Sequence, residues 1–484
     1  MNPERRSQIR PDRIRKNPYG IRKRMDKPMK KRFGKRTAKL AALVLTAGLM
    51  LTGCGSTNSG TTGTSGENPG STVTPDKPAY TQGITNLSAS VKKIDVPETP
   101  FKETHAAALS KSGEKLLQKI LEISKDPNGN YLISPLSIQM ALGMVATGSD
   151  EGSRTRQELM SVLMPGSSEA PSALSEEMAT LANRMEGALD VKWNVANSIW
   201  VNDNGRVKLR DSYIGDVTNY YNAELYGAPF DQSTIDAING WVNENTNGMI
   251  PQIINDLSPD ARIALVNALA FEGEWAVQYE ENDIDENGIF KNANGSETKV
   301  TMLHSQEAAA IHLAGGLGFI KNYKGGKFSF VGILPEQGTT TEAYMKKLAE
   351  DPGSFAEAFK NADYSKDVYA TMPEFKTEYG LCMDETLKQM GMSESYSDDA
   401  KFAAMVADDS MPVKIGTVIH KTLIDVSRKG TKAAAATVVV MDEACAAPDF
   451  DEPYYITLDR PFVYAIVDNE SGVPIFLGVQ NTMN

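Results

Sequence analysis

The chain has few of the residues on which common catalytic and metal sites are built. It contains 484 residues but only three cysteines and four histidines, the latter being His105, His304, His312 and His420. None of the histidines lies in a metal-binding spacing such as His-Glu-x-x-His. The chain also has no Gly-x-Ser-x-Gly elbow and no Walker-type phosphate loop. The sequence therefore gives no support for an enzyme, a metal site or a cofactor.

Cysteine is too scarce for a disulfide framework. The three positions are Cys54, Cys382 and Cys445. If Cys54 is modified, a bridge between Cys382 and Cys445 and two free thiols both remain open.

Charge is distributed unevenly along the chain, whose formal net charge is −12. Residues 1–39 carry 16 Lys or Arg and 3 Asp or Glu, which leaves 34 basic and 59 acidic residues in the rest. Because phosphate binding needs basic side chains, this acidic body argues against a nucleic-acid partner.

The basic N-terminus leads into an apolar run, LAALVLTAGLML, at 40–51, and then into Leu51-Thr52-Gly53-Cys54. The run is short for a membrane span and has the length of a secretory signal core. Leu-Thr-Gly-Cys resembles the lipobox of bacterial lipoproteins. This resemblance implies a signal peptide over 1–53, a lipid anchor on Cys54 and a cell-surface or extracellular body anchored to the bacterial cytoplasmic membrane. An uncleaved anchor is the alternative, and Met25 and Met29 are alternative translation starts.

The next segment, 54–100, is predicted to be a flexible tether. Gly, Ser, Thr and Pro dominate residues 55–80, which offer almost nothing apolar to bury. No internal repeat and no second folded domain follows, so residues 101–484 are predicted to form one domain. With 41% hydrophobic residues, the chain can build a sizeable core.

The segment 430–448, GTKAAAATVVVMDEACAAP, has an unusual composition. The four consecutive alanines are compatible with a helix, whereas Thr437 and the valines after it favour an extended chain. Such a segment suits two states, an exposed loop and a strand inserted between two others. By strand alternation, one face of that strand would carry Thr431, Ala433, Ala435, Thr437, Val439 and Met441. That face is small at its leading end, as insertion into a crowded sheet requires.

Several motifs occur along the body in a fixed order. They are ISPLSIQ (133–139), VKWNVANSIWV (191–201), NGW (239–241), ALVNALAFEGEW (264–275), TMPEF (371–375), LKQMGM (387–392), IDVSRKGTKAAAATVVV (424–440) and RPF (460–462). Together they resemble the serpins, the serine protease inhibitors that trap proteases by inserting a cleaved loop into their own sheet. The resemblance covers residue 106 to the C-terminus.

The resemblance implies an α+β serpin fold over 101–484. We expect a large central mixed β-sheet, smaller sheets, about eight to nine helices and an exposed reactive loop. It implies a suicide-type inhibitor of serine endopeptidases that is itself no enzyme, works without a cofactor and is a monomer. A non-inhibitory serpin-fold binding protein and a serpin directed at cysteine proteases are the alternatives. A solute-binding lipoprotein is disfavoured because the chain lacks two similar halves.

The same resemblance assigns roles to individual residues. The loop hinge comprises Gly430, Thr431, Lys432, Ala433, Ala434, Ala435, Ala436 and Thr437. The run of alanines in this stretch favours an inhibitor, because non-inhibitory relatives tend to carry bulky, charged or proline residues there. Arg428, Lys429 and Lys432 depart from the family, which often has acidic residues around the hinge glycine.

The family's spacing places the reactive bond at Ala444–Cys445, with cleavage at Met441 or Cys445 as the alternative. A small residue before the bond suits an elastase-like or subtilisin-like protease. Three residues match the family's shutter, the hydrogen-bonded cluster beneath the point where the sheet opens: Ser134, Asn267 and His420.

Overall fold

The computed structural model describes residues 83–483, apart from 168, 189, 204–206, 409 and 432–451. In this part of the chain nine α-helices accompany three β-sheets, which confirms the expected α+β class. The helices are α1 (Glu103–Ser124), α2 (Pro135–Thr147), α3 (Arg154–Leu163), α4 (Ser172–Glu186), α5 (Asp211–Tyr220), α6 (Gln232–Asn245), α7 (Thr341–Glu350), α8 (Phe355–Lys360) and α9 (Asp384–Gln389). Among the described residues, no helix has the length and apolar composition that a membrane crossing needs.

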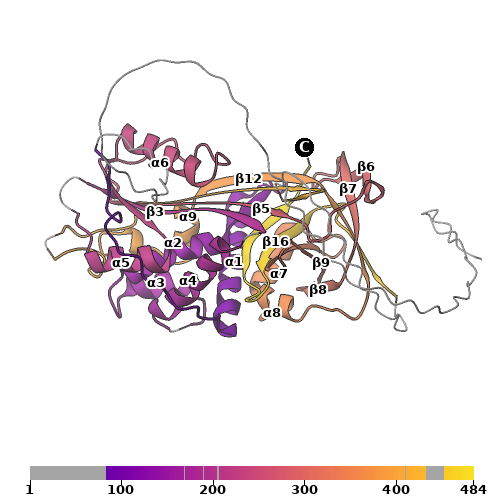
Figure 1. Cartoon of the computed structure of the whole chain (residues 1–484), viewed down its shortest axis with the longest axis horizontal. Coiled ribbons are helices and arrows are strands. Elements are labelled where there is room, and N and C mark those ends of the chain that lie inside the picture. The colour runs from indigo at the N-terminus through magenta and orange to yellow at the C-terminus, as the bar shows by residue number, and fades with distance from the viewer. Residues whose placement is uncertain are drawn as a thin grey trace, which may run out of the picture. The chain divides into compact units, whose positions relative to one another are not determined.

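The largest sheet has seven strands and mixed direction. Its order is β1 (Thr85–Asn86), β4 (Glu224–Ala228), β3 (Val191–Asn202), β5 (Ile263–Glu274), β14 (Gly430–Thr431), β13 (Thr417–Ser427) and β12 (Phe375–Cys382). The β3–β5 pair is antiparallel, whereas β5 and β13 run parallel. Figure 1 shows α6 on one face of this sheet and α2 to α5 on the other. Both faces are therefore covered, which explains why the first nine residues of β5 are all buried.

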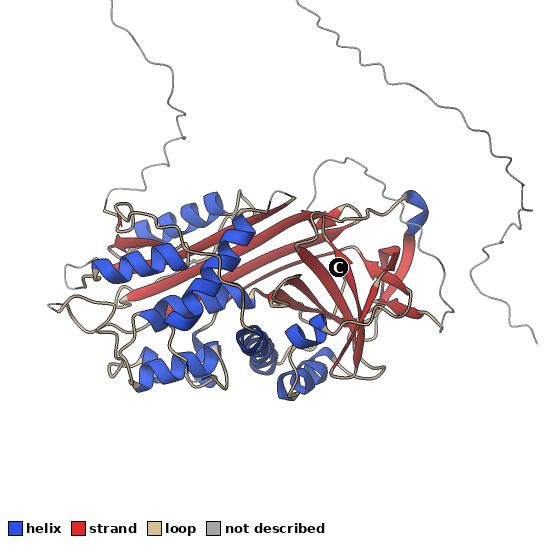
Figure 2. Ribbon diagram, turned by 60° about the horizontal axis from the view of Figure 1, so that its bottom comes forward, coloured by secondary structure: helices blue, strands red, loops and turns tan. Residues whose placement is uncertain are grey.

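Two smaller sheets complete the body, and Figure 2 shows them beyond the end of the long strands. The six-stranded sheet contains β2 (Tyr131–Ile133), β17 (Pro474–Gln480), β16 (Phe462–Asp468), β10 (Phe328–Leu334), β9 (Gly316–Asn322) and β8 (Ala309–Leu313) in that order. The four-stranded sheet contains β15 (Tyr454–Thr457), β11 (Val368–Pro373), β7 (Glu297–Glu307) and β6 (Ile284–Lys291).

The start of α2 follows from its local sequence. Proline at the first helical position loses no hydrogen bond, because that N–H has no partner within the helix. The side chain of Ser134 caps the helix by accepting a hydrogen bond of 3.1 Å from the backbone N–H of Ser137. The cap fixes Ser134 under the central sheet, where it contributes to the site described below.

The folded body begins earlier than residue 101, which corrects the predicted extent of the tether. Thr85 and Asn86 pair with β4, and the backbone N–H of Leu87 donates to the carbonyl of Leu225 at 2.8 Å. Val96 is buried. The sequence around these residues carries spaced apolar side chains, so it can pack against a sheet edge where the Gly- and Ser-rich stretch could not.

A buried carboxylate joins α1 to α8 and gives a first testable prediction. Glu114 is fully buried, pairs with Lys111 and accepts a hydrogen bond of 2.7 Å from the backbone N–H of Phe355. Burial raises the pKa of Glu114 to about 7 despite Lys111. Because the folded state holds this proton more tightly than the unfolded state, the free energy of unfolding should fall as pH rises from about 4.5 to about 7, by up to roughly 3 kcal/mol.

Glu114→Gln keeps an acceptor for the Phe355 N–H and removes the titration. Urea unfolding between pH 4.5 and pH 8 should show this component in the wild-type protein and not in the variant. Parallel pH profiles for the two proteins would contradict the assignment.

Candidate functional site

The candidate site lies where β5 and β13 part in the middle of the large sheet. The two strands pair directly and in parallel from Ala264 opposite Thr417 to Ala270 opposite Leu423. Beyond these pairs, β14 lies between them and runs antiparallel to both. Thr431 lies opposite Gly273 on one side and Val426 on the other. The first two residues of the predicted hinge therefore occupy the beginning of a slot for an extra strand.

Only glycine fits at position 430. Its φ is +144°, and a Cβ there would lie 2.7 Å from the Cα of Glu274. An L-residue would be strained by the backbone angle and would collide with the neighbouring strand. The close approach of β14 to β5 thus depends on this residue type.

Thr431 is held by Tyr323, which in turn stacks on Trp275. It is fully buried, and its hydroxyl is hydrogen-bonded to the hydroxyl of Tyr323 at 2.6 Å. Trp275 stacks on Tyr323 with ring centres 4.6 Å apart and donates from Nε1 to the carbonyl of Ser427 at 2.9 Å. The hydrogen bond between Thr431 and the buried Tyr323 shows that the Thr431 side chain faces the core, as strand alternation predicts.

An ion pair fixes the turn that precedes the hinge. Arg428 donates through Nε and Nη2 to the two carboxylate oxygens of Glu374, at 3.0 and 3.1 Å, and its backbone N–H donates to the same side chain at 2.8 Å. Arg428, which departs from the family pattern, thus has an acidic partner between β11 and β12.

The three predicted shutter residues meet beneath this slot, and all are buried. Nε2 of His420 accepts a hydrogen bond of 3.0 Å from the backbone N–H of Ser134. Nδ1 of His420 lies 2.9 Å from Oδ1 of Asn267. Since Nε2 accepts, Nδ1 carries the proton and donates to Asn267. Burial lowers the pKa of His420 to about 3, so the ring is neutral at physiological pH.

Two further residues belong to this cluster and were not predicted. Asn267 donates to the carbonyl of Ser137 at 3.0 Å and to the side chain of Asn197, and the hydroxyl of Ser137 donates to Asn267. Asn197 lies opposite Asn267 on β3. The available signal was a polar residue within the mostly apolar helix α2, Ser137, and a polar residue within β3, Asn197. Tyr323 and Glu374 were also missed, because only the tertiary structure brings them to the hinge.

Most of the predicted loop lies outside the described residues. This applies to Lys432, to Ala433, Ala434, Ala435 and Ala436, to Thr437, to the reactive bond at Ala444–Cys445 and to the lipid anchor Cys54. Their assigned roles therefore stay predictions.

A family model described as Serpin (serine protease inhibitor) matches residues 108–482. The chain belongs to the serpin family. Membership carries a protease-inhibitor type of function in general, and serpins are generally not enzymes.

Known serpins resemble this one over most of their length. Serpin-Z2A of Triticum aestivum is 28% identical over 379 residues, which cover 76% of this chain and 93% of the relative. The thermophilic serpin tengpin in its native state is 33% identical with a TM-score of 0.73, covering 83% of this chain and all of that one. Its latent state is 30% identical with a TM-score of 0.66, covering 80% and 100%. A thyroxine-binding globulin complex with thyroxine, 20% identical with a TM-score of 0.65 and covering 78% and 98%, shares the fold alone.

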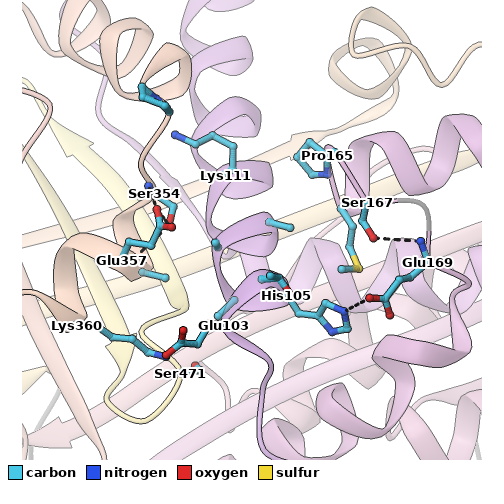
Figure 3. A pocket seen from close by; sticks show the side chains of 18 of the residues that line it. Glu103, His105, Lys111, Pro165, Ser167, Glu169, Ser354, Glu357, Lys360 and Ser471 are labelled. Atoms are coloured by element: carbon cyan, nitrogen blue, oxygen red, sulfur yellow. Dashed lines mark hydrogen bonds and ion pairs between the residues drawn. The ribbon is translucent and has the colours of Figure 1, made fainter.

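A cleft beside α1 is a second candidate site in this serpin, and Figure 3 shows the side chains that line it. Its volume is about 860 Å³. His105 is buried between two carboxylates, 2.8 Å from Glu177 and 3.1 Å from Glu169. Glu169 also pairs with Lys102 at 3.3 Å. His105 and Glu177 thereby join α1 to α4, and the polar groups of this cluster contact one another. Among the described residues, no set of three or more His, Cys, Asp or Glu side chains could hold a metal ion.

Proposed function

We propose that this serpin is a suicide-type inhibitor of serine endopeptidases. The protease serine attacks the carbonyl of Ala444, the amine of Cys445 departs, and an ester joins the enzyme to Ala444. The freed segment then enters the central sheet as a strand before water reaches the ester, and the displaced protease loses its active geometry.

The observation that carries this proposal is the position of Gly430 and Thr431 between β5 and β13. Further insertion would replace one parallel pairing with two antiparallel ones, and antiparallel pairing is slightly more stable per residue. A net gain on the order of ten backbone hydrogen bonds, at 0.5–1.5 kcal/mol each, would supply about 5–15 kcal/mol. Burial of Val439 and Met441 adds roughly 1.5–3 kcal/mol for each side chain.

The register set by Thr431 defines where the later residues would lie. Continued residue by residue, Thr437 reaches the level of Asn267 on β5 and His420 on β13. Insertion would separate these two shutter partners, and the threonine hydroxyl would lie between them as a replacement partner.

The same register gives a prediction about the basic hinge residue. Lys432 would lie on the outward face between Glu272 of β5 and Asp425 of β13. Lys432→Glu would place three carboxylates side by side, so insertion should slow by about 3- to 10-fold, and the number of inhibitor molecules consumed for each protease should rise. Glu272→Lys combined with Asp425→Lys should restore the Lys432→Glu variant. No change in stoichiometry for Lys432→Glu would show that these charges do not meet.

The location is also part of the proposal. The apolar run before Cys54 and the Leu-Thr-Gly-Cys sequence support a lipid anchor on Cys54, which would hold the inhibitor outside the cytoplasmic membrane. Palmitate labelling of the full chain, compared with Cys54→Ser, tests this point. Equal labelling of both proteins would refute the anchor.

A non-inhibitory binding protein is the second candidate, since thyroxine-binding globulin shares the fold. The small hinge residues 433–436 favour inhibition over this alternative.

The decisive test mixes residues 81–484 with elastase, subtilisin, trypsin and chymotrypsin, and separately with the cysteine protease papain. We expect a covalent complex that survives denaturant with at least one serine protease, elastase or subtilisin first among them. Cleavage by every enzyme without a complex would favour the binding protein. A complex with papain alone would redirect the proposal to cysteine proteases.

A further inference from the structure

The four-stranded sheet has an exposed face with an unusual composition. Tyr455, Tyr369 and Gln306 lie side by side across β15, β11 and β7, and Thr457, Thr371 and His304 form the next row. We call these six residues the tyrosine face. The residues between them, such as Val368, Ala370 and Ile456, point to the other side and are buried in the core. The alternation along β15 and over residues 369–371 of β11 thus places these two rows on the solvent side of the sheet.

The tyrosine face combines large exposed rings with a lack of charge. Tyr455 is 71% exposed and Tyr369 is 42% exposed, and their rings stack with centres 5.3 Å apart. His304 is hydrogen-bonded to Thr371 at 2.9 Å. None of the six side chains is acidic, lysine or arginine, although the body as a whole is strongly acidic. Exposed tyrosines on rigid strands lose little conformational entropy on binding and are enriched where proteins bind one another.

The tyrosine face lies next to the point at which the chain returns from the reactive loop. The described chain stops at Thr431 and resumes at Glu452, and β15 starts at Tyr454. Tyr455 follows Cys445 by ten positions in the sequence, and ten extended residue steps span at most about 35 Å. A protease domain of about 250 residues has a radius of gyration near 18 Å and is therefore about 45 Å across. The tyrosine face thus lies within one protease diameter of the predicted reactive bond.

The usual size of protein–protein interfaces also supports contact between a bound protease and this face. A stable protein complex usually involves about 20–30 residues on each side, more than the few residues of a loop that fill a protease cleft. A protease held on the loop must cover neighbouring surface, and this face adjoins the loop's C-terminal end. We infer that the tyrosine face is a second docking surface for the target serine protease, which it binds before the reactive bond is cleaved. This inference rests on the proposed function and adds a determinant of target choice outside the loop.

The test measures the second-order rate constant of covalent complex formation with elastase or subtilisin, whichever forms the complex. Tyr369→Ala combined with Tyr455→Ala should lower this rate constant about 10- to 100-fold and leave the stoichiometry of inhibition unchanged. Binding of the same protease with its catalytic serine replaced by alanine should weaken by a similar factor. Tyr364→Ala is the matched control, since Tyr364 is 69% exposed in the turn before β11 but lies outside the six residues. Its rate should equal that of the wild-type protein.

The outcomes separate this inference from the proposed function. A complex that forms at the wild-type rate in the double variant overturns the docking surface and leaves the inhibitory function standing. Absence of any complex in the wild-type protein overturns both. If the double variant loses both its rate and its folded structure, its melting temperature will be lowered. The single variant Tyr455→Ala, at the more exposed position, then tests the docking surface without this complication. If that variant keeps the wild-type rate, the inference fails. A double variant that loses only self-association or glycan binding would also refute a protease partner.

Discussion

Replacing Ala435 with lysine should turn the protein from an inhibitor into a substrate. If the loop inserts in the register set by Thr431, residue 435 would face the core between Leu269 of β5 and Thr422 of β13, both of which are buried. Burying a lysine there without a partner costs several kcal/mol. If only about 1.4–3 kcal/mol of that cost appears in the barrier, insertion slows by about 10- to 100-fold. Hydrolysis of the ester would then be faster than insertion of the loop.

The measurement is the yield of denaturant-stable complex against cleaved protein at a fixed ratio to the protease. Ala435→Lys should give cleaved inhibitor and active enzyme. Ala435→Ser is the matched control, because its side chain fits the same space, and it should keep the wild-type yield. Equal yields for the lysine and wild-type proteins would mean that residue 435 does not enter the sheet.

His420→Ala should lower the stability of the native sheet by roughly 3–5 kcal/mol. The substitution leaves a cavity, removes the acceptor of the Ser134 N–H and removes one of the two donors to Asn267 Oδ1, the other being the Ser137 hydroxyl. With the contact between β5 and β13 weakened, the loop should insert without cleavage or the protein should polymerise on heating. His312→Ala, at an exposed histidine on β8, is the control. Unchanged monomer stability on heating would contradict the role of His420.

The same histidine predicts sensitivity to acid. The pKa of His420 is about 3 in the folded protein, against about 6.5 in an unfolded chain. Below pH 6.5 the unfolded state takes up a proton that the folded state rejects, so stability falls as pH drops toward 3. The loss from this residue reaches roughly 5 kcal/mol at the lower end. Unfolding curves of the wild-type protein and His420→Ala between pH 7 and pH 4 should converge as the pH falls, and a constant separation would refute the assignment.

Local signals in the sequence were enough for most of the fold. Pro135 after Ser134 marked the start of α2, and the apolar alternation from Val191 marked β3. The family motifs predicted how these elements are arranged, and the structure places Ser134 and Asn267 within hydrogen-bonding distance of His420.

Other features depend on tertiary contacts that no local pattern carries. Tyr323, which directly follows β9, contacts Thr431 across 108 residues of sequence, and Glu374 pairs with Arg428 across 54 residues. The strand at Thr85 was missed because two residues give no periodicity, and only the free edge of β4 makes them extended. That Tyr369 and Tyr455 lie next to each other on the exposed face could not be predicted without the register between β11 and β15.

The melting temperature of the protein before and after a single cut near residue 444 tests the central claim most directly. The cut can be made with a trace of a non-target protease and located by mass spectrometry. If the uncut loop holds back a strand that the sheet can still accept, the nicked protein should melt roughly 20 °C or more above the intact one. An unchanged melting temperature would show that the gap between β5 and β13 stores no usable energy.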